Sequence, residues 1–233
     1  MTQQEQGGFG SWSLSAIAHR YARVRARKGY GASALLAFIS FMISLTAQYY
    51  AVAFATSHVS NTVTDLFLSN VPRVDVDGIY VYGLFCLVAF IIFLFAVNPK
   101  RAPFIGYSLA LFIIIRSVFV TLTHLAPYPI ATGPDFGAAM TKIFFGGDLF
   151  FSGHTGVPFL MALIYWREKW LRYLFIAWSI FFGLIVLLGH LHYSIDVLSA
   201  FFITYSIYHL ALYLFPWSRE LFLEDDPVEV AVV

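Results

Sequence analysis

Two short polar stretches guide the interpretation of this chain: Phe150 to Gly156 reads FFSGHTG, and His190 to Asp196 reads HLHYSID. Each stretch lies beside an apolar run, and each contains a histidine close to hydroxyl, glycine or carboxylate groups. The surrounding sequence is largely apolar. We interpret it as a frame that holds these polar residues in position.

The composition indicates a membrane-embedded protein. The chain has 233 residues, of which 60% are hydrophobic, 19% aromatic and 12% charged, whereas soluble domains carry about 25% charged residues. A mean hydropathy of +0.76 requires several long apolar runs. The net charge of +1 gives no reason to expect a nucleic-acid partner. The single cysteine, Cys86, excludes an intramolecular disulfide and a cysteine-rich metal site.

Six apolar runs predict an all-α polytopic membrane protein with six transmembrane helices, because about 20 apolar residues cross a bilayer core about 30 Å thick. The runs cover residues 31–56, 78–97, 104–122, 149–166, 173–191 and 197–215. We therefore expect three parts in the chain. These are a polar and basic N-terminal arm (1–29), a six-helix membrane catalytic domain (30–216) and an acidic tail (217–233).

The distribution of basic residues predicts the orientation in the membrane, since cytoplasmic loops carry the excess of Lys and Arg. On one side lie the basic residues of segments 20–28, 100–101 and 167–172, together with Arg219. The opposite loops contain only Arg73 and Lys142. Both termini are therefore predicted to be cytoplasmic. Both polar stretches then lie at the outer, periplasmic or lumenal, face, where we expect the active site.

His192 and Asp196 are spaced i and i+4, so a carboxylate at the start of the last helix can accept the imidazole proton. Such a bond fixes the tautomer and makes the other ring nitrogen a better nucleophile or base. An acidic group inside a membrane is costly unless it has a partner or a task. The alternative interpretation is that Asp196 only caps the helix and that His192 is an interfacial side chain.

His154 is predicted to open the fourth helix on the same face, after Ser152 and Gly153. Free backbone N–H groups at a helix start favour an anion such as phosphate. With a second helix starting near Asp196, two helix N-termini would converge on one point. The alternative is that His154 is an interfacial anchor. His190 is expected to point to a different face from His192 and to have a supporting or interfacial role.

Arg116 interrupts the third apolar run, about 18 Å from its cytoplasmic end at 1.5 Å per residue. An unpaired guanidinium at that depth is costly, so we expect it to face an anion. The candidates are Asp148, Asp196 and a substrate phosphate. A buried structural ion pair is the alternative to a phosphate-binding role.

These residues resemble a known family. GGDLFFSGHT (146–155) followed by HLHYSIDV (190–197) resembles the paired signatures of the sphingomyelin-synthase-like branch of the type 2 phosphatidic acid phosphatase superfamily. A stretch upstream is similar to the preceding motif of that branch, with a Leu-to-Pro spacing one residue longer; it includes Arg116, Thr123, Leu125, Pro127 and Pro129. The resemblance extends over about residues 116–202.

The chain also departs from the branch. Gly146 stands where the branch usually has a cysteine, and Ser206 stands where it has an arginine. The hydrolytic lipid phosphatases have a Ser-Arg pair before the nucleophile and a further Lys/Arg signature upstream, and this chain lacks both: Val186 stands six residues before His192. The resemblance therefore favours the transferase branch.

The resemblance implies a metal-independent enzyme without a cofactor, which moves a phospho-headgroup from a glycerophospholipid to a lipid alcohol such as ceramide or diacylglycerol. His192 would attack phosphorus to form a phosphohistidine-type intermediate, and Asp196 would orient it. His154 would protonate the departing alkoxide and later deprotonate the acceptor. The residues alone indicate the same roles, because the histidine with the carboxylate partner is the better nucleophile.

Three other functions remain open at the level of sequence. A lipid phosphate phosphatase would use the same His154, His192 and Asp196 with water as acceptor. A metal-dependent membrane hydrolase would take its ligands from these residues together with His190 and Asp148, although the HExxH pairing of such enzymes is absent. A non-enzymatic haem carrier would use His154 and His192 as axial ligands, but it has no use for Asp196.

Overall fold

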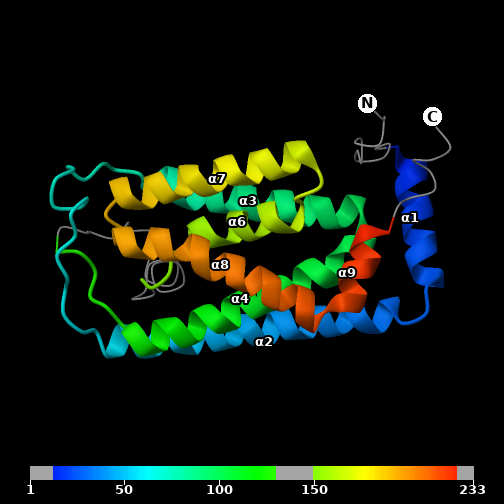
Figure 1. Ribbon diagram of the computed structural model, residues 1–233, viewed down its shortest axis with the longest axis horizontal. Helices are drawn as coiled ribbons and strands as arrows, with labels where there is room; N and C mark the ends of the chain where they lie inside the picture. Colours follow the sequence, from blue (N-terminus) through cyan, green and yellow to red (C-terminus); the bar gives the residue numbers. More distant parts are fainter. Residues whose placement is uncertain (1–12, 130–148, 225–233) are drawn as a thin grey trace.

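The computed structural model describes residues 13–129 and 149–224, and all of the regular elements in these two ranges are helices (Figure 1). Five of them are long and apolar enough to cross a membrane, by length and composition. They are α2 (Tyr30–Ser57), α3 (Asp77–Val97), α4 (Ala102–Thr123) with the preceding 3₁₀ turn η1 (Pro99–Arg101), α7 (Lys169–Leu188) and α8 (Ser194–Leu214). The chain is thus an integral multi-pass membrane protein with helical spans.

The fourth predicted span is a shorter helix than the apolar run suggested. α6 (Gly153–Ile164) has 12 residues, which is about 18 Å of helix and too short for a bilayer core of about 30 Å. It begins late because Ser152 acts as N-cap, its side chain accepting a hydrogen bond from the Thr155 N–H. Leu149 to Phe151 are therefore non-helical. Six spans are not confirmed by the described residues.

Two short helices lie together at one end of the bundle, opposite the connection between α2 and α3 (Figure 1). α1 (Leu14–Ala26) falls within the predicted basic arm, and α9 (Pro216–Leu223) follows α8. Arg20 of α1 is buried and donates a hydrogen bond to the Val97 carbonyl at 3.1 Å. Arg101 forms an ion pair with Glu168 at 2.6 Å at the same end. This end collects most of the basic residues, and its cytoplasmic location remains a prediction.

The main hydrophobic core lies between α3, α4, α6, α7 and α8, and large aromatic side chains are fully buried in it, including Phe104, Phe112, Phe151, Phe175 and Phe182. Close helix contact within this core depends on Gly156. A Cβ atom added at Gly156 would lie 2.7 Å from two ring atoms of Phe112 and 2.9 Å from the hydroxyl oxygen of Thr204. Gly156 thus lets α6 pack against α4 and α8 at this point.

We expect Gly156→Ala to destabilise the protein by about 1–3 kcal/mol, the usual cost of overpacking a dense interior. The matched control is Gly31→Ala in α2, where an added Cβ meets no atom within 4 Å. Thermal unfolding of the two variants in the same detergent measures the difference. Equal transition temperatures for both variants would contradict the packing described for α6.

Candidate active site

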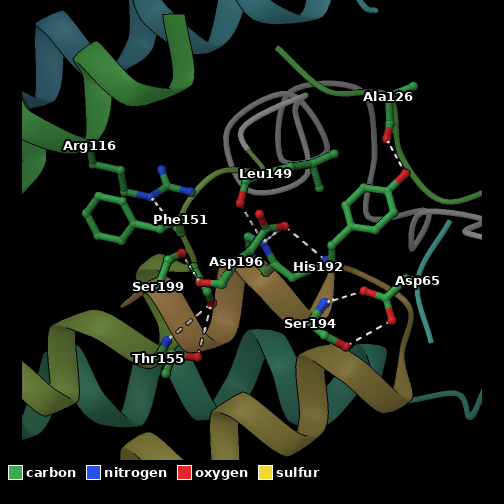
Figure 2. Close-up of polar contacts among 12 residues, drawn as sticks. Asp65, Arg116, Ala126, Leu149, Phe151, Thr155, His192, Ser194, Asp196 and Ser199 are labelled. Atoms are coloured by element: carbon green, nitrogen blue, oxygen red, sulfur yellow. Dashed lines mark hydrogen bonds and ion pairs between the residues drawn. The ribbon is translucent and has the colours of Figure 1, made fainter. Parts of the chain in front are cut away.

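The two histidine stretches meet where α6 and α8 begin, and backbone hydrogen bonds join them (Figure 2). The Ser152 N–H donates to the Asp196 carbonyl at 3.1 Å. His192, just before α8, is hydrogen-bonded through Nδ1 to the Leu149 carbonyl at 2.8 Å. The predicted convergence of two helix N-termini is therefore present in the structure.

The contacts of His192 define its tautomer. A carbonyl oxygen only accepts hydrogen bonds, so Nδ1 carries a proton and donates it to Leu149. Asp196 Oδ2 lies 3.4 Å from the same Nδ1, so the carboxylate is the more distant of two acceptors. Nε2 makes no hydrogen bond within the described residues. The neutral ring therefore has its lone pair on Nε2, which is the atom needed for nucleophilic attack.

Asp196 both caps α8 and pairs with His192, the two alternatives that its position in the sequence allowed. Its Oδ2 accepts a hydrogen bond from the Tyr193 N–H at 2.9 Å, which caps α8, while it also lies beside His192. The side chain is fully buried, and Oδ1 has no hydrogen-bond partner among the described residues. A buried carboxylate beside the imidazole can stabilise positive charge that develops on the ring during a reaction.

His154 is the second residue of α6, directly after the turn that Arg116 and Asp196 contact. Its imidazole lies within electrostatic range of both His192 and Arg116. Nε2 is buried and has no hydrogen-bond partner among the described residues. The ring is stacked on Tyr80 of α3 and contacts Phe182 of α7 edge-on. The structure thus brings the two histidines together, with one ring nitrogen of each free of a hydrogen bond.

Not every N–H group at the α6 N-terminus is available to bind an anion. The Ser152 N–H is already used by the Asp196 carbonyl, and the Ser152 side chain accepts from Thr155 at 3.4 Å (N–H) and 3.2 Å (hydroxyl). Gly153 and His154 make no N–H hydrogen bond within the described residues. The available donors are therefore those of Gly153 and His154, and Ser152 shapes the turn.

Arg116 of α4 reaches this turn, as Figure 2 shows. Its Nε donates a hydrogen bond to the Phe151 carbonyl at 2.8 Å, and the side chain is buried. A Cβ at Gly153 would lie 3.4 Å from that Nε and 3.7 Å from Cζ. The guanidinium therefore lies directly against the first residue of α6. Its positive charge adds to that of the helix N-terminus.

The remaining sequence predictions have different outcomes. His190 contacts the loop between α2 and α3, where its Nε2 lies 3.0 Å from the Val71 carbonyl. Asp148 and Lys142 lie outside the described residues. Ser206 is exposed, and its hydroxyl donates to the Phe202 carbonyl at 3.1 Å. A side chain at that position points away from the two histidines.

Sequence reasoning missed Asp65, which lies in the loop between α2 and α3. Its carboxylate accepts hydrogen bonds from the Ser194 N–H at 2.7 Å and the Ser194 hydroxyl at 2.9 Å. It also accepts from the Phe67 and Leu68 N–H groups at 2.9 and 3.0 Å. Asp65 therefore fixes the start of α8, two residues after His192. A single aspartate in a polar loop carries no local signal for such a contact.

The same loop holds the turn before α8 at further points. The Arg73 guanidinium donates to the Gly189 carbonyl at 3.3 Å, and the Val74 N–H donates to Leu188 at 2.9 Å. On the other side, the Tyr193 hydroxyl donates to the Ala126 carbonyl at 2.9 Å (Figure 2). The segment that carries His192 is therefore clamped by loops on both sides. This explains how a non-helical turn can hold the His192 side chain in a fixed place.

Within the described ranges, no three His, Cys, Asp or Glu side chains gather in a way that would hold a metal ion. His190 is directed to Val71 rather than to the two other histidines.

The hydrogen bonds to Asp65 lead to a pH-dependent prediction. Burial opposes ionisation, but the hydrogen bonds from Leu68, Ser194 and Phe67 outweigh it and lower the pKa of Asp65 from its ordinary value of 3.8. A lowered folded-state pKa stabilises the fold above the unfolded pKa, and this contribution is lost as the pH falls through the folded value. The stability difference between wild type and Asp65→Asn is therefore expected to be full at pH 7 and to shrink below pH 3.8.

Chemical denaturation of both proteins between pH 7 and pH 3 measures this difference. A suitable control is Asp75→Asn, because Asp75 is in the same loop and, among the residues that the structure describes, its carboxylate accepts one hydrogen bond, from the Asp77 N–H at 3.2 Å. If the stability difference for Asp65→Asn stays constant over this range, these hydrogen bonds do not lower the pKa of Asp65.

The comparisons with known proteins agree with this geometry. Residues 146–213 match the family model described as PAP2 superfamily C-terminal. The matched segment includes both histidine stretches and the helices α6, α7 and most of α8. No curated protein and no solved structure matches the chain. The matched part of the chain is therefore similar to the C-terminal part of the type 2 phosphatidic acid phosphatase superfamily.

Proposed function

We propose that this protein is a sphingomyelin-synthase-like transferase, which moves a phosphorylated headgroup from a glycerophospholipid to a lipid alcohol such as ceramide or diacylglycerol. One observation carries the proposal: the His192 Nδ1–H is held by the Leu149 carbonyl at 2.8 Å beside Asp196 at 3.4 Å, which leaves Nε2 unprotonated. An imidazole with a fixed tautomer and a neighbouring carboxylate is an activated nucleophile. No metal or cofactor takes part in the proposed reaction.

In the first step, His192 Nε2 attacks the phosphorus of the donor, and the bond between phosphorus and the glycerol oxygen breaks. The imidazole becomes positively charged as the P–N bond forms. Asp196, fully buried next to it, stabilises that charge. His154 gives its proton to the departing alkoxide, so diacylglycerol leaves as a neutral alcohol. His154 suits this role because its Nε2 has no competing hydrogen bond in the described residues.

In the second step, the hydroxyl of the acceptor lipid attacks the phosphorus of the phosphohistidine. His154, now neutral, takes the proton of that hydroxyl, and the P–N bond breaks to regenerate His192. The phosphorylated headgroup leaves on the acceptor. His154 thus acts as the acid in the first step and as the base in the second step.

The negative charge on the transferred phosphoryl group needs compensation. Arg116 lies against Gly153 at the start of α6, where the Gly153 and His154 N–H groups have no partner among the described residues. We propose that these groups together bind the phosphoryl oxygens, with Ser152 and Asp196 holding the turn in shape. A fixed set of donors aimed at developing charge is the strongest form of such stabilisation.

We further propose that the site opens to the outer face of the membrane and that both termini are cytoplasmic, as the distribution of basic residues predicts. The catalytic part would extend over residues 30–216, between the arm 1–29 and the tail 217–233. This orientation is testable by the accessibility of single cysteines placed in the loop between α2 and α3, after replacement of Cys86: reagents that do not cross the membrane should label them from the outer side.

A lipid phosphate phosphatase is the second candidate, because the family match is to a phosphatase superfamily and the same three side chains serve when water is the acceptor. The two functions differ only in which hydroxyl reaches the phosphohistidine. The chemistry before that step is identical.

The test of the proposal is an acceptor assay with the purified full chain. A panel of glycerophospholipids, each with a radiolabelled headgroup phosphate, is incubated with and without ceramide or diacylglycerol. We expect a labelled lipid product that depends on the added alcohol and persists in excess chelator. Label released only into water, whichever alcohol is present, would instead identify the phosphatase. Activity abolished by the chelator would overturn the metal-independent mechanism.

The residue assignment is tested by His192→Ala and Asp196→Asn. Both are expected to stay folded, since the asparagine oxygen can still accept from Tyr193. Turnover should fall by at least about two to four orders of magnitude, the usual contribution of such groups. Base-stable, acid-labile label on the protein should be present in the wild type and absent from His192→Ala. Ser206→Ala, on the exposed side of α8, serves as the control and should match the wild type.

A further inference from the structure

Tyr80 is an aromatic side chain outside both histidine stretches that contacts a proposed catalytic group. It lies in the first turn of α3 and is 4% exposed. Its ring is stacked on the imidazole of His154, with the ring centroids 4.0 Å apart and 26° between the planes. Phe182 of α7 contacts the same imidazole edge-on, with centroids 5.6 Å apart. Side chains from two other helices therefore bound the His154 ring.

The two histidines of the site are held in different ways. The His192 ring is oriented by hydrogen bonds from Nδ1 to Leu149 and Asp196. The His154 ring makes no hydrogen bond within the described residues, and its Nε2 is buried without a partner. Hydrogen bonds therefore do not fix the plane of the His154 ring in this part of the chain. The orientation of the His154 ring is therefore set by its packing against Tyr80 and Phe182.

Ring orientation matters here because a proton moves along the direction of the Nε2 lone pair. A rotation of the imidazole about its Cβ–Cγ bond turns Nε2 away from the oxygen that it protonates. A flat stack resists this rotation, since the rings lose face-to-face contact as it proceeds. Misplacement of about 1 Å in a reacting group can cost about a hundredfold in rate.

The charged groups in electrostatic range of His154 are His192 and Arg116, and neither contacts the ring through a hydrogen bond in the described residues. Both become or remain positive during the proposed reaction. They repel a protonated His154, so the ring needs an uncharged contact to stay in place. The π-face of Tyr80 supplies such a contact and attracts a cationic imidazole.

We propose that Tyr80 is a positioning residue for the acid–base catalyst: its ring face holds the imidazole of His154 in the plane required for proton transfer at Nε2. The inference rests on the proposed function, in which His154 exchanges that proton. It gives α3 a role in positioning the catalytic histidine, although α3 lies outside the segment that matches the family model.

The test compares Tyr80→Phe, which keeps the aromatic face, with Tyr80→Leu, which removes it. We expect kcat of Tyr80→Leu to fall about tenfold to a hundredfold, with KM for the donor lipid within about twofold of wild type. Tyr80→Phe should restore kcat to within about twofold of wild type. Leu87→Ala, fully buried two turns further along the same helix, is the control for a general loss of packing.

Nuclear magnetic resonance of histidine-labelled protein in detergent provides a readout that does not depend on turnover. The ring protons of His154, assigned from their absence in His154→Gln, should be shifted upfield by the ring current of the stacked phenol. The shift should persist in Tyr80→Phe and disappear in Tyr80→Leu. If wild type transfers no headgroup at all, the proposed function fails while this measurement still reports on the stack.

Four outcomes would overturn the inference. They are an unshifted His154 in wild type, an unchanged kcat in folded Tyr80→Leu, a loss of kcat in Tyr80→Phe as large as that in Tyr80→Leu, and the same loss of kcat in Leu87→Ala. The first shows that the stack does not exist in solution. The others show respectively that the stack has no effect, that the hydroxyl rather than the ring is responsible, and that the loss follows from core packing in general.

Discussion

The hydrogen bond from His192 Nδ1 to the Leu149 carbonyl is the interaction on which the candidate site depends. A non-helical segment inside an apolar bundle has backbone groups that lipid cannot satisfy, so protein groups must do so. Here the Leu149 carbonyl accepts a hydrogen bond from His192, and the Phe151 carbonyl accepts one from Arg116. The Ser152 N–H donates to the Asp196 carbonyl. The requirement to satisfy buried backbone groups thus orients the same side chains that the proposed chemistry uses.

Much of the fold follows from the sequence because the length and polarity of an apolar run are local properties. Helices α2, α3 and α4 begin and end within two residues of the predicted runs. The length of the fourth predicted helix was wrong. Leu149 to Phe151 are apolar and uncharged, and hydropathy does not distinguish a buried turn from a helix. The helix start near His154 was predicted, but the non-helical turn before it depends on Arg116 and His192, which are distant in sequence.

The site shows the same division between local and distant contacts. The pairing of His192 with Asp196 follows from their spacing, and the place of His154 follows from the helix start. The contact of Asp65 with Ser194 joins residues more than a hundred positions apart, and no pattern near either residue announces it. The stack of Tyr80 on His154 also joins residues that are far apart in sequence. Such contacts become visible only when the helices are packed.

The depth of the α6 start has a mechanical consequence. Arg116, which binds the turn before α6, lies seven residues before Thr123 at the end of α4, which is about 10 Å of helix. A lipid phosphate rests at the bilayer surface, so a donor lipid must sink, or the leaflet beside the protein must become thinner, before the two can meet. Deforming a leaflet costs free energy that grows with its thickness. Under the proposed function, the physical state of the host membrane would therefore set part of the activation barrier.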